Sequence, residues 1–464
     1  MPSPRTSDSP APDLERRLTL FDATLIIVGS IIGVGIFTTT GLIAEALPNP
    51  RLILLVWVVG GLLTLCGALT YAELGSALPR AGGEYVYLQE AYGPFVGFLN
   101  GWTYFLVTNP GSIAAMSIGV IHNVEPFVPW VSLQRLALDF NLAGRSVQLS
   151  TGHATALLLI LFFSAVNYCG VRFGSLVQNA LTLAKLGGIL AFVGFGLVVG
   201  EGRWDNFSHA LSPTDIAGLP RQLSQAMIAV IFAFTGWFAS TYVASEIREP
   251  RRNVPYSIIC GTLVVVATYF VINVAYLYGL PVERMKGIVN VGESAALALF
   301  GHGGSVLVSL SIVISILGAM NSVILTAPRI YYAMARDGLF FRTAGAVHPR
   351  FRSPGNSIVI QAVWSCLLAL SGSFGQLLTY TVVAMLGFSI LTAVALFVLR
   401  RRRPELDRPY RTSGYPWVPL LFIFGYLMIL ANVLVASPRE ALSGLVIVAA
   451  GVPAYLYWKR KPKA

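Results

Sequence analysis

Uninterrupted apolar runs of about 20 residues recur along this chain and constrain its fold more than any other feature. An α-helix of roughly 20 residues crosses the hydrocarbon core of a bilayer, which is about 30 Å thick. Lipid offers no hydrogen-bond partners to the backbone, so spans must be helices or closed β-barrels. The runs are continuous rather than alternating, which favours helices. Only 11% of the 464 residues are charged, too few to cover a water-facing surface of this size.

The sequence therefore predicts an all-α membrane protein with twelve transmembrane helices. The third and eighth runs are longer than one crossing needs, so we expect tilt or short flanking helices there. The predicted spans are 21–46, 52–78, 85–121, 153–169, 174–199, 221–246, 256–279, 304–336, 356–372, 376–399, 416–436 and 440–458.

The predicted spans form two groups of five helices, followed by two additional helices. Residues 21–199 would hold helices 1–5, residues 221–399 helices 6–10, and residues 416–458 two further helices. Tails precede and follow them at 1–20 and 459–464. An even number of spans places both tails on one side of the membrane.

Basic residues predict which side that is. With the N-terminus in the cytoplasm, 22 of the 32 Lys and Arg residues fall on cytoplasmic segments and 8 on outer loops. Such an excess marks the cytoplasmic side. We expect a multi-pass protein of the cell (inner) membrane, in contact with lipid, with both termini cytoplasmic. The formal net charge of +11 then reflects topology and requires no nucleic-acid partner.

Glycines interrupt the first helix of each half. Span one contains Gly29, Gly33 and Gly35, and span six contains Thr235-Gly236. Glycine costs about 1 kcal/mol relative to alanine inside a helix. Paired interruptions at matching positions of two halves indicate a binding site at the bilayer midplane. The alternative is that Gly29 and Gly33 form a GxxxG packing face.

An unwound helix frees groups of both polarities. N–H groups near Val34 to Phe37 suit a carboxylate, and carbonyls near Ile31 and Ile32 suit an ammonium. A zwitterion such as an L-amino acid would satisfy both at once.

Lys185 lies near the middle of span five, too deep for its side chain to reach the interface. An intramembrane cation is costly and must face the protein interior. Three interpretations stay open: the ammonium replaces a bound Na⁺, it carries a proton, or it is purely structural.

Five segments in order resemble the amino acid–polyamine–organocation (APC) superfamily, and within it the L-type amino acid transporters. These segments are "GSIIGVGIF", "TYAELGSALPRAGGEYVYL", "FAFTGWFASTYVASEIREPRRNVP", "GAMNSVILTAPRIYYAMARDGLF" and "RRRRPELDRPYRTSGYP". The resemblance covers nearly the whole chain. It implies a 5+5 inverted repeat (the leucine-transporter-like fold) with discontinuous helices 1 and 6, plus two additional C-terminal helices.

The resemblance also implies roles for single residues. Lys185 would bridge spans one and eight, and Phe232 would be an aromatic gate. Val34 stands where many relatives have serine, which removes a hydroxyl but leaves the backbone donors. The substrate-binding residues implied are Ile31, Gly33, Val34, Gly35, Thr108, Ser112, Phe232, Thr235 and Gly236.

The leading functional prediction is a sodium-independent secondary transporter of neutral L-amino acids that works as an exchanger. A proton-coupled symporter is the rival. A membrane-embedded enzyme and a channel are remote alternatives, because the five histidines lack metal-site spacing and no filter motif is visible. We expect no cofactor and no metal. Residues 123–152 contain no cysteine, so no covalent glycoprotein partner is expected.

Overall fold

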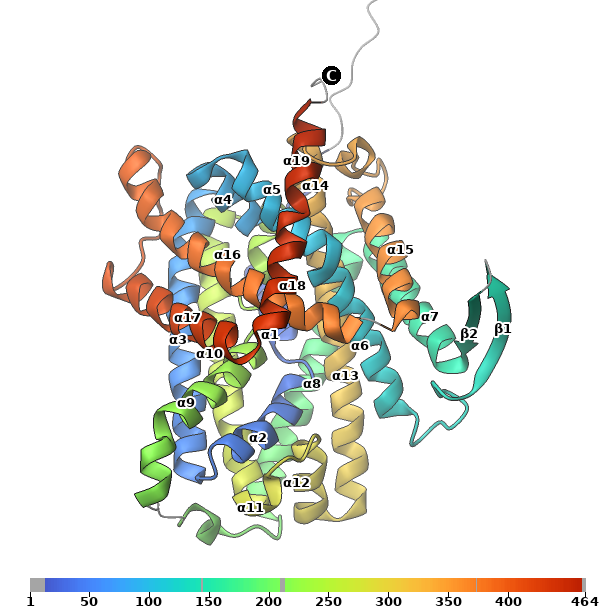
Figure 1. Cartoon of the computed structure of the whole chain (residues 1–464), viewed down its shortest axis with the longest axis vertical. Coiled ribbons are helices and arrows are strands. Elements are labelled where there is room, and N and C mark those ends of the chain that lie inside the picture. Colours follow the sequence, from blue (N-terminus) through green and yellow to red (C-terminus); the bar gives the residue numbers. More distant parts are fainter. Residues whose placement is uncertain (1–12, 143–144, 209–212, 373, 461–464) are drawn as a thin grey trace, which may run out of the picture.

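The computed structural model describes residues 13–142, 145–208, 213–372 and 374–460, and these are mostly helical (Figure 1). The elements in chain order are α1 (Leu20–Ile31), α2 (Gly35–Ala46), α3 (Pro50–Ala77), α4 (Glu84–Tyr92), α5 (Pro94–Thr103), η1 (Tyr104–Thr108), α6 (Asn109–Val124), β1 (Leu136–Leu142), β2 (Arg145–Ser150), α7 (Thr151–Tyr168), α8 (Val171–Val198), η2 (Trp204–Phe207), α9 (Pro213–Ala233), η3 (Ala239–Thr241), η4 (Ala244–Glu246), α10 (Pro250–Gly279), α11 (Val282–Met285), α12 (Val291–Phe300), α13 (His302–Thr326), α14 (Pro328–Arg336), η5 (Arg342–Gly345), α15 (Gly355–Ser371), α16 (Phe374–Arg402), α17 (Trp417–Ala436), α18 (Pro438–Ala449) and α19 (Gly451–Arg460).

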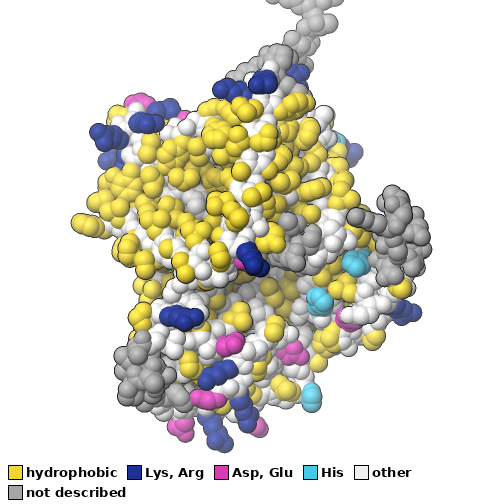
Figure 2. All heavy atoms as spheres, viewed as in Figure 1, with side chains coloured by type: hydrophobic (Ala, Val, Ile, Leu, Met, Phe, Trp, Pro, Cys, Tyr) yellow, Lys and Arg dark blue, Asp and Glu magenta, His cyan; other side chains and the backbone are white. Residues whose placement is uncertain are grey.

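Many of these helices can cross a membrane. Within the described residues, nine are long and apolar enough, or ten if the bent pair α1–α2 counts as one span. Hydrophobic side chains cover much of the upper half of the face shown in Figure 2, and charged side chains gather toward its upper and lower edges. The chain is a multi-pass helical membrane protein.

Two of the twelve predicted spans are not among those ten. The predicted span 221–246 coincides only in part with α9, which ends at Ala233. The predicted span 356–372 corresponds to α15, an apolar helix of 17 residues.

The interruptions predicted in spans one and six are both present. The Thr19 hydroxyl and the Asp22 carboxylate form a reciprocal cap at the start of α1. This helix ends at Ile31, and α2 resumes at Gly35 with a bend of 41°. After α9 the chain continues through irregular turns and the short 3₁₀ helices η3 and η4, so the second half of span six is not an α-helix.

Proline shapes span three. The flanking helix expected there is α4, which Gly93 and Pro94 separate from α5. The π-helical turn η1 precedes Pro110. A proline has no N–H and its ring displaces the carbonyl four residues earlier, which here is Leu106. That carbonyl instead accepts the indole N–H of Trp364 at 2.7 Å.

A short hairpin lies in the segment 123–152, between the third and fourth predicted spans. Strands β1 and β2 pair antiparallel there. The sequence of β1 alternates apolar and other residues at Leu136, Leu138 and Phe140, which is the period of a strand. This alternation extends over one short strand, so it is a weak signal beside the long apolar helices.

The end of the molecule that carries α4 and α14, at the top of Figure 1, is closed by polar contacts; we call it the α4 end. Arg329 forms an ion pair with Glu246 at 2.7 Å, and both side chains are fully buried. The predicted N-terminal tail, 1–20, is described only from residue 13; there Arg17 and Leu18 donate their backbone N–H groups to the Glu246 carbonyl. The predicted C-terminal tail, 459–464, is described only to residue 460.

This ion pair generates a first prediction. Arg329→Met leaves the Glu246 carboxylate buried without its cation, and breaking such a pair costs about 3–5 kcal/mol. We expect a clear fall in the thermal unfolding midpoint of the detergent-solubilised protein. The double variant Glu246→Gln/Arg329→Met should recover much of the loss. An unchanged midpoint for Arg329→Met would contradict the assigned contact.

Candidate functional site

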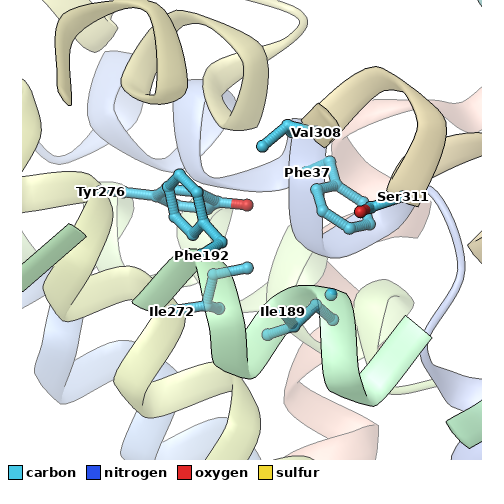
Figure 3. Close-up of a pocket in the computed structure, with 8 residues that line it drawn as sticks. Phe37, Ile189, Phe192, Ile272, Tyr276, Val308 and Ser311 are labelled. Carbon is cyan, nitrogen blue, oxygen red and sulfur yellow. The ribbon is translucent and has the colours of Figure 1, made fainter. Parts of the chain in front are cut away.

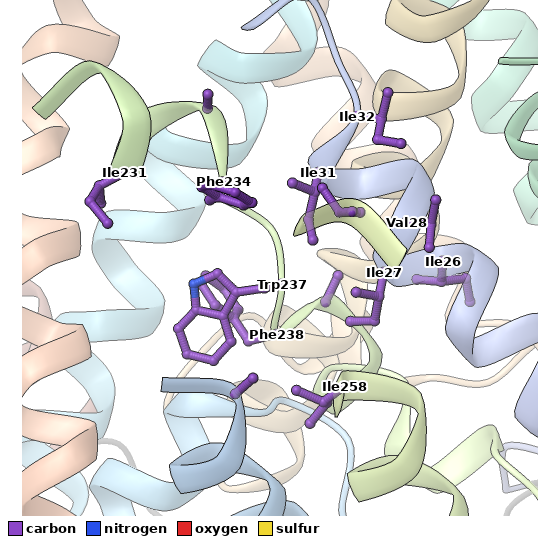
Figure 4. Packing of buried hydrophobic residues seen from close by; sticks show 14 of the residues in the cluster. Ile26, Ile27, Val28, Ile31, Ile32, Ile231, Phe234, Trp237, Phe238 and Ile258 are labelled. Carbon is purple, nitrogen blue, oxygen red and sulfur yellow. The ribbon is translucent and has the colours of Figure 1, made fainter. Parts of the chain in front are cut away.

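The interruptions of spans one and six lie against each other. Gly236 has φ +110°, a conformation that L side chains rarely adopt, and a Cβ there would lie 3.0 Å from the Cβ of Ser30. A Cβ at Gly35 would lie 3.3 Å from the Cα of Ala233. Figure 4 shows the irregular chain after α9 descending beside α1, with Trp237 at its side and Ile31 opposite. The two breaks therefore form one centre.

Lys185 reaches this centre from α8. Its fully buried ammonium donates to the carbonyls of Gly29 at 3.2 Å, Ile32 at 2.7 Å and Ser315 at 2.9 Å. Two of these carbonyls belong to the broken end of α1 and the third to α13. The lysine thus connects spans one and eight, as the resemblance implied, and its donors are satisfied inside the membrane.

Tyr269 of α10 also contacts both breaks, and sequence reasoning missed it. Its buried hydroxyl lies 2.9 Å from the Ile31 carbonyl and 3.1 Å from the Ala233 carbonyl, the last residues of α1 and α9. The available signal was a hydroxyl-bearing side chain inside an apolar span. That signal is weak, because tyrosines are common in this chain.

A chain of buried amides connects the supporting helices. Asn167 of α7 donates to Asn321 of α13, and Asn321 donates to Gln178 of α8. The Gln178 amide lies so close to α1 that a Cβ at Gly29 would fall 1.9 Å from its nitrogen. Gly29 is therefore a packing glycine, as the alternative proposed. A Cβ at Gly33 would meet only Ala319 at 3.6 Å, an ordinary contact.

The N–H groups at the start of α2 form the positive pole of the centre. The first turn of a helix leaves its N–H groups without intrahelical acceptors. Val34, the N-cap of α2, is 41% exposed, whereas Ile31 and Ile32 are buried. Two N–H groups near the break are already used: that of Gly33 donates to the Ile31 carbonyl at 2.9 Å, and that of Phe37 donates to the Val34 carbonyl at 3.0 Å.

The other predicted site residues are placed less centrally. Phe232 is 59% exposed near the end of α9, and the hydroxyl of Thr235, which follows that helix, donates to the Ile231 carbonyl within it. The hydroxyls of Thr108 and Ser112 likewise donate to carbonyls of their own span. Among the described contacts, the structure joins Ile31, Gly33, Val34, Gly35, Gly236 and Lys185 at the two breaks, but not Thr108 and Ser112.

Two cavities in the described part of the chain do not suit a zwitterion. One, about 10 Å³, lies beside α2 and has room for about one water; Phe37, Phe192 and Tyr276 line it (Figure 3). The other, about 420 Å³, is lined by apolar residues that include Leu106 and Trp364. Neither contains a break, so the free backbone groups at the breaks remain the candidate site.

Broken apolar helices around a buried lysine define a class of protein: a membrane carrier with its site inside the bilayer. The comparisons with known proteins agree. The model of the amino acid permease family matches residues 18–456. The chain belongs to the amino acid permease family, within the APC superfamily.

Several relatives match over nearly their whole length. The serine/threonine exchanger SteT of Bacillus subtilis (strain 168) is 32% identical, over 97% of this chain and 98% of its own. The human cystine/glutamate transporter is 29% identical, over 97% of this chain and 87% of its own. The human b(0,+)-type amino acid transporter 1 is also 29% identical, over 95% and 88%.

Lys185→Met is the sharpest test of the centre. The variant keeps the length of the side chain but leaves three carbonyls without their donor, each at a cost of about 1–3 kcal/mol if unsatisfied. We expect amino acid transport into proteoliposomes to fall at least about tenfold. The control is Lys286→Met, the same change at an exposed position, which should transport normally. Equal rates in both variants would remove Lys185 from the mechanism.

The two central glycines give a second, matched comparison. Gly236→Ala forces a positive φ on alanine and a close contact with Ser30, at a cost of about 1–3 kcal/mol. Gly33→Ala adds a methyl group where there is room. We expect Gly236→Ala to lower the unfolding midpoint and Gly33→Ala to leave it nearly unchanged. The reverse order would show that the break in span six is misplaced.

Proposed function

We propose that this protein is a sodium-independent exchanger of neutral L-amino acids that works by alternating access. The juxtaposition of the two helix breaks carries the proposal. The N–H groups at the start of α2 would bind the substrate carboxylate, and carbonyls at the ends of α1 and α9 would bind its ammonium. Ile31, Gly33, Val34, Gly35 and Gly236 would form this backbone site.

Sodium independence follows from the place of the Lys185 ammonium. Its three carbonyl partners would otherwise be a cage of oxygens from two helices, which is the kind of ligand set that a hard cation takes. A covalently attached cation fills this place permanently. It holds α1 to α13 without a dissociable ion, so no sodium gradient would drive transport.

The immediate neighbours of the breaks favour a neutral substrate. The side chains in contact there include those of Ser30, Lys185, Ala233, Tyr269, Ala319, Thr39, Gln178 and Thr182. No carboxylate is among these described contacts to pair with a cationic side chain. A relative named for serine and threonine exchange supports small neutral substrates. Phe232, Thr235, Thr108 and Ser112 would shape the outer and side-chain parts of the pocket.

The proposal includes a topology. Twelve spans, the broken span six and α15 among them, would form the 5+5 inverted repeat of the leucine-transporter-like fold with two helices added. Both termini would be cytoplasmic in the inner membrane, so the α4 end would face the cytoplasm. The exposure of Val34 at the central break, together with the closed α4 end, then corresponds to an outward-facing state.

The expected partners are the L-amino acid and membrane lipid. The segment 123–152 offers no cysteine to bridge to a glycoprotein, although some relatives are animal transporters. Neither nucleic acid nor a catalysed reaction enters the mechanism.

A proton-coupled symporter is the second candidate, and one buried group favours it. The Glu84 carboxyl is fully buried at the start of α4 and accepts hydrogen bonds from the hydroxyls of Tyr71 and Tyr104. Among its described partners there is no basic side chain. A buried carboxyl held by neutral donors is a group that can exchange a proton.

Proteoliposome transport separates the two candidates. A panel of the twenty amino acids in a thermal-shift screen would first find the substrates, with L-serine and L-threonine expected among them. We then expect labelled L-serine to enter vesicles that are preloaded with unlabelled L-serine. Uptake into empty vesicles should be negligible. Uptake into preloaded vesicles should be equal in Na⁺ and K⁺ buffers. Concentrative uptake into empty vesicles, driven by an inward proton gradient, would instead select the symporter.

A further inference from the structure

The larger of the two cavities lies on the surface of the helix bundle, and the proposed transport site makes no use of it. Its volume of about 420 Å³ is within the range of roughly 300–1,000 Å³ that ligand pockets occupy. Helix α15, the turn η1 and the residue before η5 form its walls, so we call it the α15 groove. Phe341, Val359 and Val363 are each about half exposed, which leaves the groove open to the membrane. Its walls are apolar and include Phe105, Leu106, Phe341, Val359, Val363 and Trp364.

The α15 groove extends inward from the α4 end of the molecule. The turn η5 packs against α14 there, and the Asn356 amide at the start of α15 donates to the Thr343 carbonyl of η5 at 2.8 Å. Trp364 lies roughly 12 Å further along α15, at a rise of 1.5 Å per residue. The groove therefore has one end at the charged edge of the molecule and the other within the hydrocarbon.

An acyl chain by itself would not bind this groove selectively. A chain that leaves bulk lipid for an apolar groove exchanges one hydrocarbon contact for another, so the hydrophobic effect contributes little. Preference for one lipid over another must come from its headgroup. The side chains at the α4 end of the groove therefore decide which lipid occupies it.

The side chains at that end are basic. The ring of Trp458, near the end of α19, contacts the ring of Phe341 at a centroid distance of 5.4 Å. Lys459 and Arg460 follow Trp458 directly, and both are exposed. Figure 1 shows the end of α19 beside α14, at the same edge of the molecule. Two cations thus lie next to the wall of the groove.

Little negative charge opposes these cations. The segments 338–372 and 441–464 contain no aspartate or glutamate. Glu15, from the N-terminal segment, pairs with Arg352 at 3.5 Å, whereas no carboxylate in the described part of the chain pairs with Lys459 or Arg460. The positive charge at this end of the groove is therefore available to an anion from outside the chain.

We propose that the α15 groove binds an anionic phospholipid, with one acyl chain against Trp364 and the phosphate at Lys459 and Arg460. Basic groups beside apolar clefts between membrane helices are the chemistry that recognises anionic headgroups. The inference goes beyond the proposed function and does not depend on which substrate the protein carries.

The bound chain covers a contact that span three requires. The Trp364 indole donates to the Leu106 carbonyl, which Pro110 leaves without its intrahelical donor. Both Leu106 and Trp364 line the groove. An acyl chain packed there holds α15 against η1, so the lipid stabilises the break in span three.

Native mass spectrometry of the delipidated whole protein tests the charged end. Phosphatidylglycerol and phosphatidylcholine are titrated separately with identical acyl chains, and we expect phosphatidylglycerol to bind more tightly. In Lys459→Gln/Arg460→Gln its dissociation constant should rise at least about tenfold, because each basic residue near the surface contributes about a factor of five. The control Arg401→Gln/Arg411→Gln removes two exposed charges from the same end of the molecule and should leave the affinity unchanged.

A second pair of variants tests the groove itself. Val363→Trp fills the groove, whereas Val446→Trp adds the same side chain to the exposed face of α18. Both valines are more than half exposed, so both variants should fold. We expect Val363→Trp to lose the preference for phosphatidylglycerol and Val446→Trp to keep it.

Three results would overturn the inference. The first is equal affinity of the wild type for the two lipids. The second is full phosphatidylglycerol binding by Val363→Trp, which would place the headgroup on a basic surface without a chain in the groove. The third is a wild-type dimer that Val363→Trp dissociates, which would make a second copy of the chain the occupant.

Discussion

The Lys185 ammonium and the broken end of α1 depend on each other. Inside a membrane, an ammonium needs several acceptors, and the carbonyls of an unbroken helix already accept intrahelical hydrogen bonds. Because α1 ends at Ile31, the carbonyls of Gly29 and Ile32 become available, and the lysine satisfies them together with that of Ser315. Neither partner is stable alone in hydrocarbon. This interaction fixes where α1 stops and how it lies against α8 and α13.

The irregular half of span six is held at one end by α1 and at the other by the segment just before α1. Gly236 meets Ser30 at the centre of the molecule, and Ile247 pairs with Leu18 at the α4 end. The Glu246–Arg329 ion pair ties this second contact to α14. A displacement of α1 therefore moves span six with it. Opening the α4 end requires that the buried pair be separated or exposed, which makes it a gate in the proposed mechanism.

The sequence singles out residues whose presence in an apolar helix costs free energy. It does not reveal residues whose role depends on their neighbours in the folded structure. Glycines in an apolar run and one lysine at mid-span have few explanations, so Gly236 and Lys185 stood out. The role of Tyr269 depends on which carbonyls lie beside its ring, which only the packing of three helices determines. Thr108 and Ser112 are the opposite case, because they were predicted as site residues and the structure does not bring them to the breaks. Hydroxyls inside helices readily bond their own backbone, and the structure shows both doing so.

The two poles of the proposed site differ in how ready they are for a substrate. The Phe37 N–H donates to the Val34 carbonyl at 3.0 Å, but no acceptor is described for the N–H groups of Gly35 and Ile36 at the start of α2. Val34 beside them is exposed, so in the proposed site a carboxylate would bind there without displacing a protein partner. The carbonyl pole is occupied, because Lys185 holds Ile32 while Tyr269 and the Gly33 N–H hold Ile31. An ammonium gains only the difference between its own bond and the one it replaces. In the proposed site, binding would then be specific for a zwitterion yet moderate in strength, and a carrier needs that balance because it must release on one side what it bound on the other.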